Sequence, residues 1–157
     1  MKPYIVLGAG GHAKVLVDIL QETGQEILAI CDADFLKEGT KLLGVSVYGS
    51  EELIYRQKPE RIFLVNGLGS IGNGMARTDL FLRFKQRGYS SATIVSPHAC
   101  VSRNAGIDEG TCVFQGAIIQ AGSRVGKNVI VNTRASIDHD CAIADHCHIA
   151  PGVTLSG

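Results

Sequence analysis

Hydrophobic positions in the second half of the chain recur every six residues. From Val95 onward the repeated aliphatic positions are Val95, Val101, Ile107, Val113, Ile119, Val125, Val131, Ile137, Ile143, Ile149 and Leu155. Four residues after each comes a small or β-branched residue: Ala99, Ala105, Thr111, Ala117, Ser123, Val129, Ala135, Cys141, Cys147 and Val153. A hexapeptide solenoid has this period, because each hexapeptide forms one short strand and one corner of a coil. We therefore predict a β-solenoid over these residues.

The corners of such a solenoid favour residues that tolerate a positive φ angle. Glycine and asparagine adopt this conformation at little cost. They recur at the expected corner positions, which are Gly106, Gly110, Gly116, Gly122 and Asn128. The aliphatic residues then point inward and stack on their equivalents in the next coil, while the small residues fit near each corner.

The first half of the chain has a different hydrophobic pattern. Short apolar runs at 4–8, 26–31 and 61–66 are typical of buried parallel strands. Helical spacing and end signals predict helices near 13–20, 50–57 and 77–87. This βαβαβα order predicts a small doubly wound parallel sheet. We place the boundary near 90–94, which gives an α/β domain over 1–92 and a solenoid domain over 93–157.

Composition narrows the class of protein further. The formal net charge is zero, so nothing indicates nucleic acid or a membrane surface as a partner. The apolar run at 4–7 is too short to span a bilayer and has no basic segment before it, so we predict a cytoplasmic protein. The cysteines are odd in number and lack a disulfide framework, which indicates reduced thiols that fill small apolar spaces: Cys31, Cys100, Cys112, Cys141 and Cys147.

The loop after the first predicted strand is a candidate phosphate site. Gly8, Gly10 and Ala13 fit the G-x-G-x-x-G/A fingerprint, and Asp32 follows about 20 residues later. Glycines let the backbone approach a pyrophosphate, and the following helix offers free N–H groups. Candidate side-chain contacts are His12 and Lys14 for the phosphates and Asp32 and Asp34 for a ribose or base. The alternative is a tight turn that binds no ligand.

A second cluster of polar residues lies at 136–148. It contains His139, His146 and His148 together with Asp138, Asp140, Asp145 and two cysteines. We expect no metal here, because the hexapeptide register places Cys141 and Cys147 on different faces of the coil. A histidine beside carboxylates can act as a general base near neutral pH. The alternative is a set of solvated outer positions of the solenoid.

These motifs together resemble one known family. The Gly8-Ala-Gly-Gly-His-Ala-Lys14 loop, followed by hexapeptides with Asn132-Thr, Ile137-Asp-His-Asp-Cys and His148-Ile-Ala-Pro-Gly152, resembles sugar O-acyltransferases of the sialic acid O-acetyltransferase type. That family includes bacterial N-acetyltransferases acting on UDP-4-amino-sugars of the bacillosamine and perosamine pathways. The resemblance implies an α/β Rossmann-like domain followed by an all-β left-handed parallel β-helix. It also implies a homotrimer with active sites between subunits.

The resemblance also implies roles for individual residues. His139 would be the general base that deprotonates the acceptor as it attacks the acetyl-CoA thioester, and Asp140 would orient that histidine. His148 would lie near the thioester and pantetheine of acetyl-CoA. The family's loop under the nucleotide-sugar phosphates matches Gly10, Gly11 and His12. Its acidic position at the nucleoside matches Asp32.

Two departures from the family pattern give further expectations. The segment 66–77 is longer than the Gly-Asp-Asn pattern of many members, which affects acceptor specificity. The sequence ends nine residues into a fourth coil, so we expect a truncated form with a whole nucleotide pocket and an incomplete acetyl-CoA site.

Three other functions remain open from the sequence. One is O-acetylation of sialic acid, and another is a non-catalytic trimeric scaffold for a sialic acid biosynthetic enzyme. The third is a small NAD-dependent oxidoreductase, which the short predicted sheet disfavours. Exposed apolar positions such as Ile118 and Ile130 would suit a trimer interface.

Overall fold

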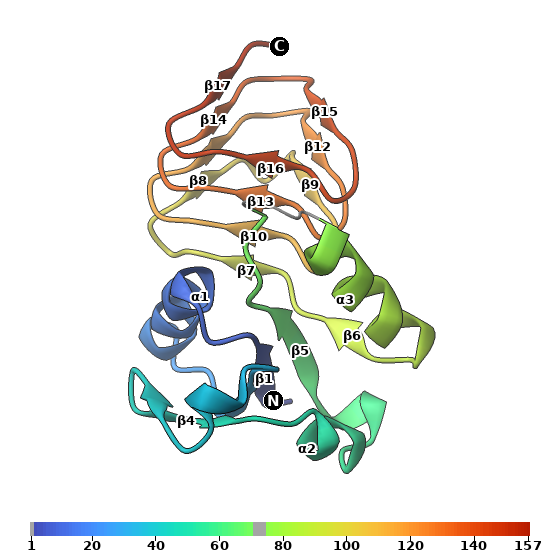
Figure 1. Ribbon diagram of the computed structural model, residues 1–157. Coiled ribbons are helices and arrows are strands. Elements are labelled where there is room, and N and C mark those ends of the chain that lie inside the picture. Colours follow the sequence, from blue (N-terminus) through green and yellow to red (C-terminus); the bar gives the residue numbers. More distant parts are fainter. Residues whose placement is uncertain (1, 71–74) are drawn as a thin grey trace. The chain divides into compact units, whose positions relative to one another are not determined.

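The computed structural model describes residues 2–70 and 75–157 and divides into two compact units, Met1–Ala92 and Thr93–Gly157 (Figure 1). The segment 66–77, which departs from the family pattern, lies partly outside the described residues, since 71–74 are not described. Each unit has its own hydrophobic core. The α/β class of the first and the β-helix of the second confirm the predicted fold class.

The first unit is built on a six-stranded sheet with the order β3-β4-β2-β1-β5-β6. Five of its strands pair in parallel: β1 (Tyr4–Leu7), β2 (Ile27–Cys31), β4 (Val45–Tyr48), β5 (Phe63–Asn66) and β6 (Ser90–Ser91). The helices are α1 (Gly11–Glu22), α2 (Glu52–Tyr55), α3 (Met75–Gln86) and the 3₁₀ turns η1 (Phe35–Lys37) and η2 (Pro59–Arg61). Strand order reverses between β1 and β5, which is where open α/β sheets bind ligands.

The core of this unit explains why these segments form strands and helices. Ile5 and Leu7 of β1 pack with Leu64 of β5, Ile54 of α2 and Phe84 of α3. The buried residues of α1 recur at helical spacing: Ala13, Leu16, Val17, Ile19 and Leu20. An apolar stripe of this kind binds the helix to the sheet.

Two details of the first unit differ from the sequence-based expectation. The antiparallel hairpin formed by β3 (Lys41–Leu42) and β4 was not predicted, and its turn residues Leu43 and Gly44 have φ angles of 49° and 84°. Such angles suit a two-residue hairpin turn. The helix predicted over 50–57 is only the four residues of α2, and the N–H of its first residue, Glu52, donates to the Ser50 hydroxyl oxygen at 3.1 Å.

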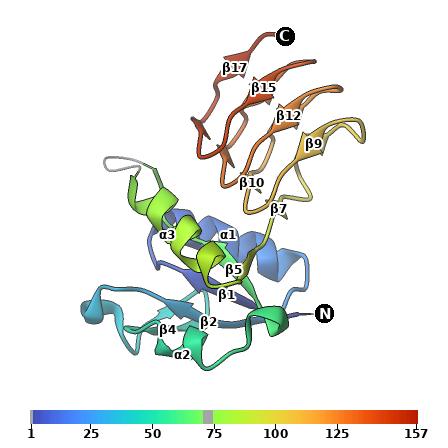
Figure 2. The same cartoon turned by 90° about the vertical axis from the view of Figure 1, so that its right-hand side faces the viewer.

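The second unit is a left-handed parallel β-helix of stacked coils (Figures 1 and 2). Its first sheet contains β7 (Ile94–Val95), β10 (Cys112–Val113), β13 (Ile130–Val131) and β16 (His148–Ile149). Its second contains β8 (Cys100–Val101), β11 (Ile118–Ile119), β14 (Ser136–Ile137) and β17 (Thr154–Leu155). Its third contains β9 (Gly106–Ile107), β12 (Arg124–Val125) and β15 (Ala142–Ile143).

The coil corners follow the six-residue period. Positive φ angles occur at Gly110, Gly116, Gly122, Asn128, Arg134, Asp140, His146 and Gly152. The prediction is therefore correct for four of its five corner residues. It is wrong for Gly106, which lies within strand β9 and not at a corner.

The interior of the β-helix is formed by the predicted aliphatic and small residues. Val113, Ile119, Val125, Val131 and Ile137 are buried, as are Ala117, Val129 and Ala135. The expectation that Ile130 is exposed is wrong, because its side chain is 1% exposed and is covered within the single chain, whereas Ile118 is 38% exposed. Among the described residues, we find no helix long and apolar enough to cross a membrane.

Candidate functional site

The predicted phosphate loop joins β1 to α1 in the first unit. Gly8 has a φ angle of 98°, and a Cβ atom there would lie 3.0 Å from Leu68 Cδ2. By contrast, a Cβ at Gly10 or Gly11 would meet nothing within 4 Å. Gly8 is therefore required for chain conformation and packing, while the start of α1 has open space beside it.

A second glycine packs the neighbouring loop closely against this one. A Cβ atom at Gly67, directly after β5, would lie 2.7 Å from the Leu7 carbonyl oxygen and 2.9 Å from Ala13 Cβ. Real Cβ atoms do not approach backbone this closely, so any larger residue would separate the loops. The carboxyl ends of β1 and β5 thus approach each other through backbone contacts.

The predicted nucleoside-contacting carboxylate Asp32 is already a structural partner of this loop. Asp32 Oδ2 accepts hydrogen bonds from the Ala9 N–H at 2.6 Å and from Lys37 Nζ at 3.0 Å. Its other oxygen accepts from the Asp34 N–H at 2.8 Å. Burial alone would raise the pKa of Asp32, but the hydrogen bonds from Asp34, Lys37 and Ala9 lower it below its usual range.

This arrangement predicts an acid-dependent contribution to stability. The folded-state pKa of Asp32 lies below the unfolded value, so its stabilisation is present above the unfolded pKa and is lost as the pH falls through the folded value. We expect Asp32→Asn to lower the free energy of unfolding by about 1–2 kcal/mol at pH 7. Urea denaturation should show a smaller difference in the free energy of unfolding between the parent and Asp32→Asn at pH 3 than at pH 7. Exposed Asp18 supplies the control Asp18→Asn, and equal losses in both variants would contradict the assignment.

The remaining predicted side chains of the first unit are His12, Lys14 and Asp34. His12 lies in the first turn of α1, and its Nε2 is 3.4 Å from Arg77 Nη1. Lys14 is exposed on the same helix. Asp34 caps η1 by accepting from the Leu36 N–H at 3.1 Å. The structure therefore brings His12 and Asp32 to the two sides of the loop, whereas Asp34 has a local capping role.

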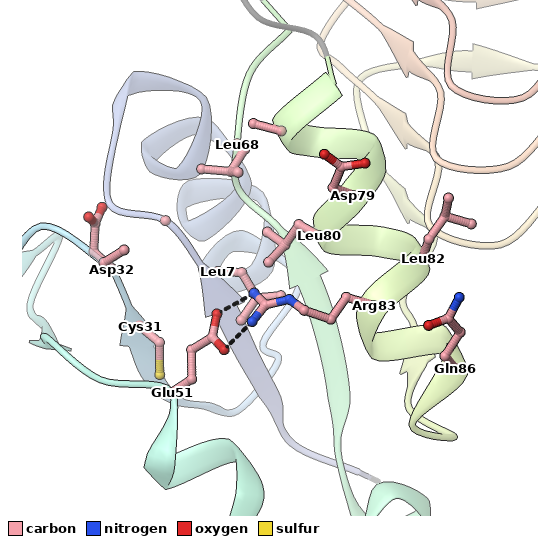
Figure 3. A pocket seen from close by; sticks show the side chains of 13 residues that line it. Leu7, Cys31, Asp32, Glu51, Leu68, Asp79, Leu80, Leu82, Arg83 and Gln86 are labelled. Atoms are coloured by element: carbon pink, nitrogen blue, oxygen red, sulfur yellow. Dashed lines mark hydrogen bonds and ion pairs between the residues drawn. The ribbon is translucent and has the colours of Figure 1, made fainter.

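A cavity of about 590 Å³ adjoins this loop and contains groups that the sequence analysis missed (Figure 3). Its walls include Leu7 of β1, Gly8 of the loop that follows, Asp32 after β2, and residues of α3. Glu51 and Arg83 face each other across its floor with two hydrogen bonds of 2.6 and 2.7 Å. The helical spacing of Asp79, Arg83 and Gln86 was the available signal, but Glu51, the partner of Arg83, is 32 residues away in the sequence.

The predicted base in the second unit has a carboxylate partner. His139 Nδ1 lies 2.9 Å from Asp140 Oδ2, and both side chains are largely exposed. Because an ionised carboxylate only accepts hydrogen bonds, Nδ1 carries the proton and Nε2 is available to take another. The hydrogen bond to Asp140 and the negative charges of Asp138 and Asp140 raise the pKa of His139. This geometry can support general-base chemistry.

A buried serine, which the sequence analysis treated only as a small filler, holds the corner that carries this pair. Ser123 Oγ donates to the Asp138 carbonyl oxygen at 2.5 Å and accepts from the Cys141 N–H at 3.3 Å. Both ends of the 138–141 corner are therefore fixed from inside the coil. The sequence shows that the inward position 123 is polar. The hydrogen-bond partners of Ser123 lie in the following coil, so they depend on how the coils stack.

The other histidines of the cluster lie at separate positions. His148 Nε2 lies 3.0 Å from Asn132 Nδ2, and His146 Nδ1 lies 3.0 Å from Asn128 Nδ2. Cys141 and Cys147 precede strands of different sheets, as the register predicted. In the described ranges 2–70 and 75–157, no group of three or more His, Cys, Asp or Glu side chains is placed to hold a metal.

Comparison with protein families identifies both units. Residues 4–84 match the family described as the PglD N-terminal domain, and residues 122–157 match the bacterial transferase hexapeptide family of six repeats. Over 116 residues the chain is 35% identical to UDP-N-acetylbacillosamine N-acetyltransferase of Bacillus subtilis (strain 168). That similarity covers 73% of this chain and 52% of the relative, so the chain spans about half the length of this curated relative.

Solved structures of similar proteins share the whole fold. Perosamine N-acetyltransferase from Caulobacter crescentus, in a histidine-to-asparagine variant with CoA and GDP-perosamine, matches with a TM-score of 0.87 and 31% identity over 100% of this chain and 72% of its own. The acetyltransferase domain of PglB from Neisseria gonorrhoeae FA1090, with acetyl coenzyme A, matches with a TM-score of 0.87 and 33% identity over 99% and 74%. The resemblance seen in the sequence is confirmed. The chain therefore belongs to the family described as the PglD N-terminal domain, and its second unit carries bacterial transferase hexapeptide repeats.

Proposed function

We propose that this protein is an acetyl-CoA-dependent N-acetyltransferase that acts on a UDP-4-amino-sugar in surface-glycan biosynthesis. The observation that carries the proposal is the His139–Asp140 pair, whose exposed ring is oriented by a carboxylate at 2.9 Å. The family membership supports it, since the relatives include N-acetyltransferases named for UDP-N-acetylbacillosamine and for perosamine.

His139 would act directly as the general base of the transfer. The acceptor amine attacks the thioester carbonyl carbon, so a C–N bond forms as the C–S bond breaks. Nε2 of His139 takes the proton that the amine loses, and the imidazolium then gives this proton to the departing thiolate, so CoA leaves as the thiol. Asp140 stabilises the imidazolium that forms, because its carboxylate accepts from Nδ1. No acyl-enzyme is required.

The nucleotide of the acceptor would bind the first unit. Gly10 and Gly11 leave open space beside the N-terminus of α1, and the positive end of a helix dipole suits a diphosphate. His12 and Lys14 would add donors to the phosphates, and Gly8 shapes the turn. The adjoining cavity beside Asp32 offers leucine side chains and polar groups to the nucleoside. Asp34 would flank the same opening.

Family membership supports the proposals for the acetyl donor and for the assembly. His148, which is held by Asn132 at 3.0 Å, would lie near the thioester and pantetheine of acetyl-CoA. A cytoplasmic homotrimer with sites between subunits would complete the enzyme, and exposed Ile118 offers an apolar position for the interface. Sedimentation at micromolar concentration is expected to give a trimer, and a monomer would contradict the intersubunit site.

Calorimetric titration with UDP, GDP, CMP and NAD tests the acceptor side of the proposal. We expect the tightest binding for UDP. A preference for GDP would show that the assigned nucleobase, uracil, is wrong, while an amino-sugar acceptor would be retained. A preference for CMP would favour sialic acid chemistry. A preference for NAD, or no binding of any nucleotide, would contradict the proposed function.

A further inference from the structure

The corners of the β-helix raise the question of why residue 122 is a glycine. Asn128, Arg134, Asp140 and His146 adopt the same positive φ at equivalent corners, with angles between 53° and 63°. The left-handed conformation alone therefore does not demand glycine at every corner. Something specific to the surroundings of Gly122 is needed to explain it.

The residue that lies over Gly122 is Asp140, one coil further along. A Cβ atom on Gly122 would overlap Asp140 Oδ1, and it would lie 3.2 Å from Asp140 Cγ. The backbone of Asp140 is held directly above, since its N–H donates to the Ala121 carbonyl oxygen at 3.2 Å. The other carboxylate oxygen, Oδ2, accepts from His139 Nδ1. One carboxylate thus rests on Gly122 and orients His139 at the same time.

We propose that Gly122 is a positioning residue for the His139–Asp140 pair, because its missing side chain leaves the space in which the Asp140 carboxylate lies. The inference rests on the proposed function only in giving that pair a catalytic role. The corner itself is fixed from inside by Ser123, which bonds Asp138 and Cys141. The backbone therefore cannot follow the carboxylate if a methyl group displaces it.

The corner glycines Gly116 and Gly152 have no carboxylate over them. A Cβ at Gly116 would meet Arg134 Cγ at 3.2 Å, and a Cβ at Gly152 would meet nothing within 4 Å. The φ angles of Gly122 and Gly152 are 79° and 71°, so alanine is strained to a similar extent at both. Gly152→Ala is consequently a matched control for the backbone cost of Gly122→Ala.

The expected effect is on the histidine more than on the fold. The Asp140 side chain is 77% exposed, so its carboxylate can swing into solvent when a methyl group occupies its place. His139 would then lose the hydrogen bond at Nδ1 while retaining the negative charge of Asp138. Because Asp138 and Asp140 are the charged groups that raise the pKa of His139, the pKa should fall but not to its ordinary value.

The test is an NMR titration of the His139 Cε1–H signal in four proteins: the parent, Gly122→Ala, Gly152→Ala and Asp140→Asn. We expect the His139 pKa to fall in Gly122→Ala and Asp140→Asn and to stay at the parent value in Gly152→Ala. The double variant Gly122→Ala/Asp140→Asn should match Asp140→Asn alone, because the methyl group then has no carboxylate to displace. In turnover, kcat should fall about tenfold in Gly122→Ala, a part of what a general base contributes.

Each other outcome contradicts the inference. An unchanged His139 pKa in Gly122→Ala would show that the carboxylate keeps its place. A further fall in the double variant would show that Gly122 acts on His139 without Asp140. Failure of Gly122→Ala to fold, while Gly152→Ala folds, would show a structural role. The titration needs no turnover, so failure of the proposed acetyltransferase function would be seen separately in the activity assay.

Discussion

Replacing His139 with asparagine is expected to lower kcat for acetyl transfer by about 10²–10⁴-fold, the contribution of a general base. Asparagine keeps the size and polarity of the side chain but cannot take a proton at neutral pH. The ring is largely exposed and lies outside the packed interior, so the melting temperature and the affinity for the nucleotide should change little. Single-turnover kinetics with saturating acceptor would isolate the chemical step.

An exposed histidine in the first coil gives a matched control for this substitution. His98→Asn removes an imidazole from the same β-helix and should leave kcat unchanged. The parent activity should also rise with pH as His139 loses its proton, with a midpoint above the ordinary histidine value because its pKa is raised. If His139→Asn retained parental turnover, the assignment of His139 as the general base would be wrong.

Replacing Arg77 with methionine is expected to destabilise the first unit by about 3 kcal/mol. Arg77 is 2% exposed, and its Nη1 donates to the Asn66 carbonyl oxygen at 2.8 Å and to the Leu68 carbonyl oxygen at 2.7 Å. Asn66 Nδ2 in turn donates a hydrogen bond to the Arg77 carbonyl oxygen at 2.9 Å. Methionine fills similar space but leaves the turn after β5 without these charged donors.

Chemical denaturation with urea would measure this loss. Arg56→Met provides the control, since that side chain is 77% exposed and forms an ion pair of 3.4 Å with Glu52. Exposed ion pairs of this type contribute about 0–1 kcal/mol. Because Leu68 lines the cavity beside the glycine loop, Arg77→Met should also weaken UDP binding. Equal stability losses in the two variants would contradict the role given to Arg77.

The β-helix was predictable because its repeat is imposed by local geometry. Each coil presents one inward residue per strand, so Val113 pairs with Val131 and Ile119 with Ile137 at a constant spacing. A sequence must repeat its aliphatic residues at that interval to fill the interior. The same spacing could have located the contact between Gly122 and Asp140, which are equivalent corners of successive coils.

The missed features depend on contacts between residues that are distant in the sequence. Arg83 and Glu51 are 32 residues apart, and no local pattern indicates that they face each other in the cavity. The burial of Ile130 likewise depends on tertiary structure, because its outward position in the repeat predicts exposure. Asp32 was predicted from the sequence as a nucleoside contact, which stays a prediction, and its bond to the Ala9 N–H could not be predicted because it depends on how β1 and β2 align.

The most direct test of the proposed function is mass spectrometry of acceptors incubated with the protein and acetyl-CoA. The acceptors would be a UDP-4-amino-sugar, GDP-perosamine and CMP-sialic acid, with His139→Asn as the inactive control. We expect the UDP-4-amino-sugar to gain one acetyl group for each CoA released, and we expect His139→Asn to abolish this gain. Binding of the UDP-sugar without any acetyl transfer, or equal transfer by His139→Asn, would contradict this expectation.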